Sequence, residues 1–236
     1  MPANGKIRRA KFVSFSGIDG AGKGTQIEAL STWLKAAGLS VRLIAFWDDV
    51  ASLTGLREAT GHTLFKGDKG VGTPTAPIDR RDKNVRSWPM SGLRLGLYFM
   101  DAISQRRVVE KALRSNADFV ICDRYIYDEL ANLSLSNPAA RLYIRLIMKI
   151  APRPDVSYIL DADPVQARAR KPEYPLDFLH TNRASYLALS NLLGTMTVIP
   201  ALPVPEVTRR VLDPVQKMLS AAGIPVESTE KLSRDR

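Results

Sequence analysis

The feature that most constrains this chain is the glycine-rich segment Gly17-Ile18-Asp19-Gly20-Ala21-Gly22-Lys23-Gly24-Thr25. An apolar run at 12–15 precedes it and an amphipathic run at 26–34 follows it, which predicts a strand, a tight loop and a helix. Glycines let the backbone amides of such a loop turn toward one anion, and the helix N-terminus adds partial positive charge there. The segment therefore predicts a phosphate-binding P-loop, in which Lys23 reaches the outer phosphates of a nucleotide.

The residue after the lysine of a P-loop is commonly Ser or Thr, whose hydroxyl reaches Mg²⁺. Here that residue is Gly24, and Thr25 follows it. Because Mg²⁺ keeps several waters and needs few protein ligands, Thr25 and one carboxylate suffice. Asp123 ends an apolar run at 119–122, which is where P-loop proteins place a carboxylate that holds Mg²⁺ waters. We therefore expect Mg²⁺ to be bound through Thr25 and Asp123, partly through water.

Short apolar runs alternate with helical patterns along the whole chain. The expected strands are 12–15, 41–46, 119–122, 156–160 and 195–199, and the expected helices are 26–34, 92–114, 126–132, 141–150, 164–170, 183–193 and 205–219. Asp163 is the expected N-cap of the helix at 164–170. This alternation predicts an α/β fold with a parallel sheet. Ligands of such sheets lie beyond the carboxyl ends of the strands, so the P-loop and Asp123 should reach one crevice.

Charge and composition narrow the partners and the compartment. The formal net charge of +10 invites a nucleic-acid interpretation, but the basic residues are scattered and aromatic residues do not interleave with them. Nucleic acid is therefore not expected as the primary partner. The chain has no run of about 18 apolar residues, so no membrane span is expected. The single cysteine, Cys122, cannot form an internal disulfide and favours a cytoplasmic location.

A second motif, Asp123-Arg124-Tyr125, completes a pattern that resembles the thymidylate kinase family. The planar guanidinium of Arg124 matches phosphate oxygens, so it is expected to hold a second phosphate. Further matches are Leu97-Tyr98-Phe99 before Asp101, the segment 160–164, and Phe178, Arg183 and Tyr186. The resemblance runs from about residue 11 to about residue 219, judged by the order of the motifs. It implies a P-loop NTPase three-layer sandwich with a central parallel sheet, helices on both faces and a lid.

The resemblance also implies roles for individual residues. The activity would be ATP-dependent phosphoryl transfer to a nucleoside monophosphate, from dTMP to dTDP. The ATP-binding residues would be Gly17, Gly20, Ala21, Gly22, Lys23, Gly24 and Thr25. The acceptor-binding residues would be Asp19 at the sugar 3′-hydroxyl, Arg124 at the monophosphate, Tyr98 or Phe99 at the base, and Tyr125. The catalytic residues would be Lys23, Asp123, Arg168 and Arg170. Because position 20 is Gly, this resembles the bacterial arrangement, in which lid arginines neutralise the transferring phosphoryl group.

The expected domain organisation follows the same comparison. Residues 1–10 would be a flexible basic N-terminus, 11–221 the P-loop kinase domain, and 222–236 a flexible tail. Within the domain, 48–90 would be a long insert or loop and 168–178 the lid. The family often pairs as homodimers, and the helix at 92–114 would offer a surface for that.

The sequence departs from the family pattern on the acceptor side. Ala102 replaces an arginine that helps to recognise thymine, Asp128 replaces a serine, and Trp47-Asp48-Asp49 replaces an Arg-Glu-Pro-like segment. Two other interpretations stay open. One is a polyphosphate-dependent nucleotide kinase, since the loop also resembles that of the second polyphosphate kinase family. The other is a non-catalytic nucleotide-binding module that associates with nucleic acid, which the net charge favours.

Overall fold

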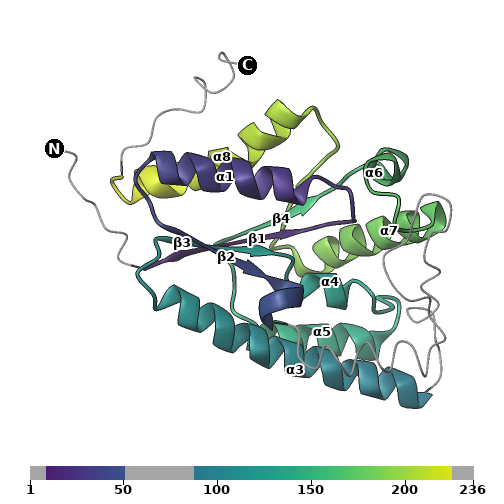
Figure 1. Ribbon diagram of the computed structural model, residues 1–236. Helices are drawn as coiled ribbons and strands as arrows, with labels where there is room; N and C mark the ends of the chain where they lie inside the picture. Colours follow the sequence, from purple (N-terminus) through teal and green to yellow (C-terminus); the bar gives the residue numbers. More distant parts are fainter. Residues whose placement is uncertain (1–8, 51–87, 225–236) are drawn as a thin grey trace.

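A five-stranded parallel sheet forms the centre of the molecule (Figure 1) in the computed structural model, which describes residues 9–50 and 88–224. The strand order is β2-β3-β1-β4-β5, and every neighbouring pair is parallel. The strands are β1 (Lys11–Ser16), β2 (Val41–Ala45), β3 (Phe119–Asp123), β4 (Val156–Leu160) and β5 (Thr197–Ile199). The predicted α/β fold with a parallel sheet is confirmed, and β1, which leads into the P-loop, is the central strand.

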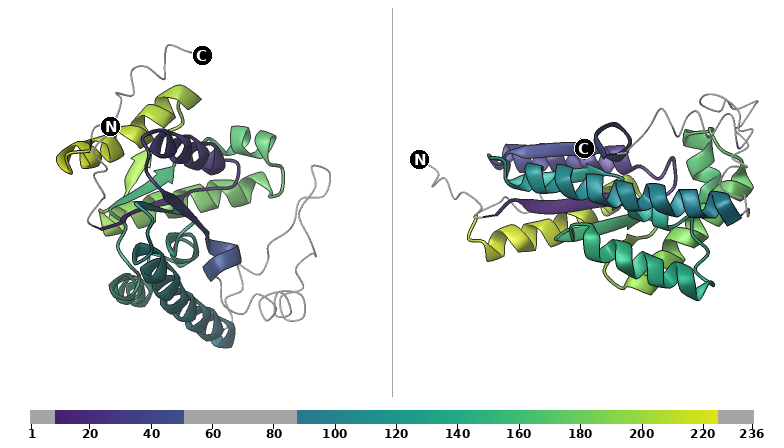
Figure 2. Two further views of the ribbon diagram at one scale, coloured as in Figure 1. Left: turned by 60° about the vertical axis from the view of Figure 1, so that its left-hand side comes forward. Right: turned by 90° about the horizontal axis from the view of Figure 1, so that it is seen from below.

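Helices cover both faces of the sheet, as predicted. The helices α1 and α8 lie on one face, and α3, α4, α5 and α7 lie on the other (Figures 1 and 2). The bounds are α1 (Lys23–Ala36), η1 (Phe46–Val50, a single π-helical turn), α3 (Trp88–Leu113), α4 (Tyr127–Leu130), α5 (Pro138–Ile150), α6 (Pro164–Arg170), α7 (Leu176–Leu193) and α8 (Val204–Ala221). Among the described residues, no helix is both long and apolar enough to cross a membrane.

Each face of the sheet packs against its own hydrophobic core. In β1, Phe12 joins the core under α3, α4, α5 and α7, whereas Val13 and Phe15 join the core under α1 and α8. Side chains alternate between the two faces of a strand, so a strand covered on both sides must be apolar at successive positions. This is why the strands could be recognised as short, mainly apolar runs, although buried Ser14 and Ser16 interrupt β1 and buried Ser157 interrupts β4.

The structure differs from the prediction mainly at the ends of elements. The segment Phe46–Val50 forms η1, so Phe46 is not part of the second strand, and α3 begins at Trp88, inside the predicted insert 48–90. The helix α7 begins at Leu176 and takes in the last residues of the predicted lid at 168–178. Buried Ala10 and Ile224 extend the packed domain into the segments predicted as flexible ends. A short helix expected near 53–58 lies outside the described residues.

Tyr125 is a correction to the predicted acceptor site. Its side chain is fully buried, its ring packs edge-on against Phe12 and Tyr127, and its hydroxyl donates a hydrogen bond to the carbonyl oxygen of Pro152. Burial raises the pKa of this phenol well above its ordinary value. Tyr125 therefore belongs to the core beneath the site and does not reach a nucleotide.

We predict that Tyr125→Phe weakens the fold without affecting acceptor binding. The carbonyl oxygen of Pro152 loses its donor, so the free energy of unfolding should fall by about 1–3 kcal/mol. Urea unfolding measures this change, and steady-state kinetics should give an unchanged KM for the nucleoside monophosphate. A raised KM with unaltered stability would return Tyr125 to the acceptor site.

Candidate active site

The candidate site lies where the carboxyl ends of β1, β3 and β4 meet. The P-loop leaves β1 after Ser16 and enters α1 at Lys23. The register sets Phe15 of β1 beside Asp123 of β3 and Ser16 beside Ile159 of β4. A side chain that follows any of these three strands is therefore delivered to the same edge of the sheet, as predicted for the P-loop and Asp123.

Lys23 lies inside the P-loop. Its ammonium group donates hydrogen bonds to the carbonyl oxygens of Gly17 and Ile18, each at 2.9 Å, and the residue is buried. Burial, and secondly the charge of Arg124, lower the pKa of Lys23 to about 8. Nearby carboxylates oppose this shift, which places Asp128, Asp19 and Asp123 within electrostatic reach of the ammonium.

Arg124 is held from two sides. Its backbone has φ +68°, a left-handed conformation that is uncommon outside glycine, and its amide donates to the carbonyl oxygen of Phe15 at 2.9 Å. Its guanidinium donates to Asp19 of the P-loop and to Asp128 of α4, the latter at 2.8 Å. Burial alone would lower the pKa of Arg124, but these two carboxylates outweigh burial and raise it.

A basic residue from the lid region reaches the same carboxylate. Lys171, which directly follows α6, has its ammonium nitrogen 3.7 Å from an oxygen of Asp19 and 3.3 Å from one of Glu173. Lys171 is about half exposed, so these ion pairs are accessible to competing anions. Asp19 therefore joins the P-loop both to Arg124 and to the segment after α6.

Asp123 offers one oxygen with a suitable environment for a hydrated cation. Its Oδ1 is enclosed and has no hydrogen-bond partner in the described part of the chain. Thr25 is exposed in the first turn of α1. A buried carboxylate oxygen without a donor is costly unless a ligand satisfies it. No group of three or more His, Cys, Asp or Glu side chains within 9–50 and 88–224 forms a protein-only metal cage, which fits a cation held mainly by waters and phosphates.

A cavity of about 520 Å³ opens beside the P-loop. Its polar wall includes Gly22, Thr25, Gln166 and Arg170. Its apolar wall comes from β5 and the segment that leads into α8, with Ile199, Pro200, Ala201, Leu202, Pro203, Val204 and Val207. The volume falls in the range of small-molecule sites, which are mostly apolar with a few placed polar groups.

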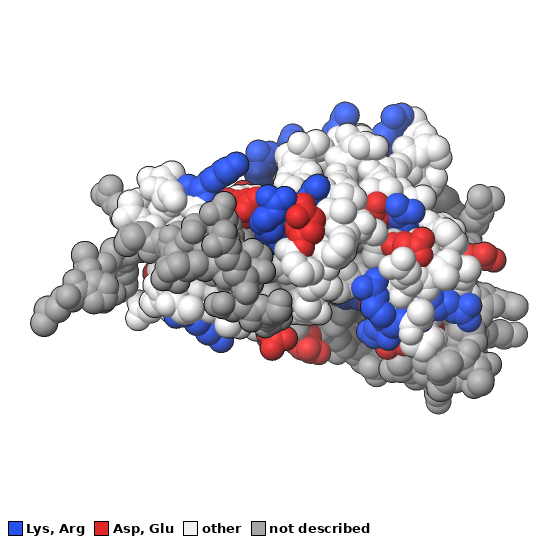
Figure 3. All heavy atoms as spheres, turned by 90° about the horizontal axis from the view of Figure 1, so that it is seen from above, with Lys and Arg blue, Asp and Glu red and all other residues white. Residues whose placement is uncertain are grey.

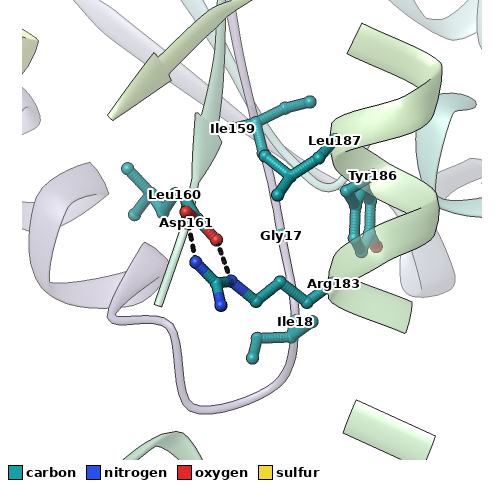
Figure 4. Close-up of a pocket in the computed structure, with 8 residues that line it drawn as sticks. All are labelled: Gly17, Ile18, Ile159, Leu160, Asp161, Arg183, Tyr186 and Leu187. Carbon is teal, nitrogen blue, oxygen red and sulfur yellow. Dashed lines mark hydrogen bonds and ion pairs between the residues drawn. The ribbon is translucent and has the colours of Figure 1, made fainter. Parts of the chain in front are cut away.

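An ion pair braces the wall between this cavity and α7. The guanidinium of Arg183 reaches from α7 to the carboxylate of Asp161 just after β4, beside Gly17 and Ile18 (Figure 4). Nη2 of Arg183 lies 2.8 Å from Oδ2 of Asp161, and Nε bonds the other oxygen. This two-point contact fixes both position and direction, because the guanidinium and the carboxylate are planar.

The structure brings together most of the predicted site residues. Lys23, Asp19, Asp123 and Arg124 form one charged group, and Arg170 and Thr25 line the cavity. Arg168 is half-buried on α6. Of the two candidate aromatic residues, Tyr98 lies on the buried face of α3 together with Ala102, whereas Phe99 is 39% exposed. Which of the two stacks on a base stays a prediction.

Three contributors to the site were not given these roles by the sequence. They are the second bond of Arg124, to Asp128, the Asp161–Arg183 pair, and the apolar wall after β5. Prolines at 200 and 203, bracketing a short loop, are the only local signal of that wall. The ion pairs depend on α4 and α7 docking onto the sheet, which no local spacing reveals.

The charged surface is mixed on the face that carries α1 and α8. Viewed from that side, basic side chains form separate groups with acidic side chains beside several of them (Figure 3). On α8, for example, Arg209 and Arg210 both pair with Glu206. The expectation that nucleic acid is not the primary partner stays a prediction.

Comparison with known proteins finds relatives that are named as thymidylate kinases or probable thymidylate kinases. The chain is 28% identical to a probable thymidylate kinase of Methanosphaera stadtmanae over 204 residues, which covers 84% of this chain and 93% of that protein. It is 31% identical to the thymidylate kinase of Prochlorococcus marinus strain AS9601 over 167 residues, covering 69% of this chain and 71% of that one.

The crystal structure of thymidylate kinase from Ehrlichia chaffeensis superposes with a TM-score of 0.53 at 21% identity, covering 88% of this chain and 98% of that chain, and supports the same fold. No family model matches the sequence. With the P-loop, the Asp123-Arg124-Tyr125 motif and these relatives in agreement, the chain belongs to the thymidylate kinase family.

Proposed function

We propose that this protein transfers the γ-phosphoryl group of ATP to dTMP. One observation carries the proposal: a nucleotide-sized cavity opens beside the P-loop, and the guanidinium of Arg124, outside that cavity, is tied to Asp19 in the same loop. Two phosphate-binding groups are thus joined through one loop, with the Lys23 ammonium inside it. Phosphoryl transfer needs this kind of fixed positioning more than covalent chemistry.

The cavity suits ATP in one orientation. The apolar wall from Ile199 to Val207 would cover the base, and the amides around Gly22 would meet the phosphates at the N-terminus of α1. Arg170 enters from α6 on the lid side of this cavity. Its position allows a full positive charge to meet the transferring phosphoryl group, where charge develops in the transition state.

The acceptor would lie at Arg124. Its guanidinium matches a monophosphate, and Asp19 beside it can accept a hydrogen bond from a sugar hydroxyl once the phosphate takes up Arg124. Tyr98 would stack on the base. The names of the relatives support dTMP as the acceptor. Ala102 supplies no charged group to read the base, so recognition would depend on stacking and on shape.

The residues around the P-loop fit a magnesium ion. The unpartnered Oδ1 of Asp123 and the exposed hydroxyl of Thr25 would hold it, in part through water. When bound, Mg²⁺ would neutralise part of the charge on the nucleotide phosphates. We also propose that the enzyme is cytoplasmic, on the basis of its single cysteine. We propose that it pairs as a homodimer, on the basis of its family.

The direct test is an ADP-release assay with ATP and a panel of acceptors. The panel holds dTMP, dUMP, dGMP, dCMP and AMP, each with and without Mg²⁺, and a parallel set replaces ATP with inorganic polyphosphate as the donor and measures the nucleoside diphosphate formed. We expect dTMP to give the highest kcat/KM and chelation to abolish turnover. Turnover with polyphosphate alone, or no turnover on any monophosphate, would overturn the proposal. Thermal-shift measurements on the same panel report binding even where chemistry is absent.

The pKa of Lys23 predicts the alkaline side of the pH profile. Since the ammonium loses its proton near pH 8 in the unliganded protein, kcat/KM for ATP should fall above about pH 8. The profile of kcat should fall at a higher pH, because bound phosphates favour the charged form. Lys23→Arg keeps the charge throughout, so its residual activity should lose this dependence. A wild-type kcat/KM that stays flat to pH 9.5 contradicts the assignment.

Arg170→Ala should lower turnover far more than ATP affinity. A lid arginine acts on charge that develops during transfer, so kcat should fall by about 10²–10³-fold while KM for ATP changes little. The matched control is Arg141→Ala, an exposed arginine on α5 that is not part of the cavity wall, and it should leave both parameters unchanged. Equal turnover of the Arg170 variant and the wild type would remove Arg170 from the mechanism.

A further inference from the structure

The tip of the P-loop touches the backbone of the lid helix α6. A Cβ atom built at Gly20 would lie 2.2 Å from the carbonyl oxygen of Ala167, 2.8 Å from its carbonyl carbon and 3.0 Å from its Cα. All three atoms are backbone, so no rotation of a side chain relieves the overlap. With α6 where it lies, position 20 admits no side chain at all.

Ala167 is held firmly within α6 by burial and by backbone hydrogen bonds. Its side chain is fully buried, its amide donates to the carbonyl oxygen of Asp163 at 2.8 Å, and its own carbonyl oxygen accepts from the amide of Lys171 at 3.0 Å. The contact with Gly20 therefore bears on the hydrogen bond that closes the last turn of α6. Arg168 and Arg170 project from this turn, so a displacement of the Ala167 carbonyl displaces both of them.

The residue before Gly20 contacts the same turn by charge. Asp19 lies 3.7 Å from the ammonium of Lys171, four residues beyond Ala167. The opposite end of α6 is closed by its own cap, because the side chain of Asp163 accepts from the amide of Gln166 at 3.0 Å. Gly20, at Ala167, and Asp19, at Lys171, thus both contact the C-terminal end of α6, which carries Arg168 and Arg170.

Gly22, another P-loop glycine with a positive φ, differs from Gly20 in its surroundings. Gly22 has φ +86° but a Cβ there would meet nothing within 4 Å. Its requirement for glycine is set by the backbone, whereas the requirement at Gly20 is set by the neighbour as well. The close approach at Gly20 is therefore a feature of the lid contact and not of the loop conformation alone.

We propose that Gly20 is a positioning residue that seats α6 on the P-loop and so sets where Arg170, the arginine of α6 that lines the cavity, meets the ATP phosphates. This rests on the proposed kinase function for its kinetic consequences, but the seat itself is a property of the fold. A methyl group at position 20 pushes the last turn of α6 away from the loop. The cavity still admits ATP, while the arginine charge arrives in the wrong place.

The test is a double-mutant cycle between Gly20→Ala and Arg170→Ala. We expect Gly20→Ala to lower kcat by about 10²-fold, the cost of misplacing a catalytic group by roughly 1 Å, with a much smaller change in KM for ATP. Because Gly20 acts through the arginine, the double variant should be no slower than Arg170→Ala alone, within about threefold. Effects that multiply in the double variant would overturn the proposal, as would an unchanged kcat for Gly20→Ala.

Gly38→Ala is the matched control for backbone strain. Gly38 has φ +76°, close to the +79° of Gly20, lies beyond α1 outside the site, and has open space around its Cβ position. It should lose similar stability to strain while keeping kcat. If Gly20→Ala does not fold, Lys171→Ala removes the other contact of the seat. Its loss of kcat should likewise vanish in the Arg170→Ala background, and a multiplicative effect there counts against the seat.

Hydrogen exchange separates failure of the seat from failure of the proposed function. In Gly20→Ala the amides of residues 165–171 should exchange faster than in Gly38→Ala or in the wild type, with no substrate present. Unchanged exchange in this segment would overturn the proposed role of Gly20, whatever the kinase activity of the variant. A wild type without kinase activity would instead overturn the function and leave the exchange result standing.

Discussion

The burial of one ammonium group inside a backbone loop is the constraint on which the site depends. Lys23 is held by two carbonyl oxygens of its own loop, and the loop keeps that shape because β1 is the central strand, flanked by β3 and β4. A buried charge is tolerated only where it is paired and hydrogen-bonded. The carboxylates at 19, 123 and 128 favour the charged form of Lys23 electrostatically. Asp19 belongs to the P-loop, whereas the other two belong to the segment from β3 to α4, which the pairing of β1 with β3 brings beside the loop.

The charge of this group indicates that a bound nucleotide would need positive charge from outside it. Three carboxylates surround two cations, Lys23 and Arg124, so the site without nucleotide has little positive charge to spare. A nucleotide brings several more negative charges. Further positive charge must come from outside the group, and the described chain offers Arg170 in the cavity wall and Lys171 at Asp19. Under the proposed function, α6 would supply the positive charge that makes the site complementary to a nucleotide.

The sequence predicted the elements that carry local signals. The P-loop, the apolar strands and the Asp163 cap were confirmed, because glycine spacing, continuous apolar runs and a capping side chain are properties of neighbouring residues. Tyr125 was placed in the acceptor site, since it adjoins Arg124 in the motif. The left-handed backbone at Arg124 turns the chain after β3, so the arginine faces the P-loop while Tyr125 enters the core. A positive φ at a residue other than glycine has no signature in the sequence.

The glycines of the P-loop are needed for different physical reasons, which the sequence motif does not distinguish. Gly17 and Gly20 each approach a backbone carbonyl, of Leu160 at the end of β4 and of Ala167 in α6, whereas a Cβ at Gly22 would meet nothing within 4 Å. Glycine thus occurs at three positions for three reasons: contact with the sheet at Gly17, contact with α6 at Gly20, and backbone conformation alone at Gly22. These contacts tie the loop to the two segments that must be correctly placed for transfer: the end of β4, which borders the cavity, and the turn that carries the arginines. Since interiors are close-packed and deform little, a loop in contact with both segments sets the distance between them. Under the proposed function, the P-loop of this chain would therefore both bind a phosphate and set the position of α6.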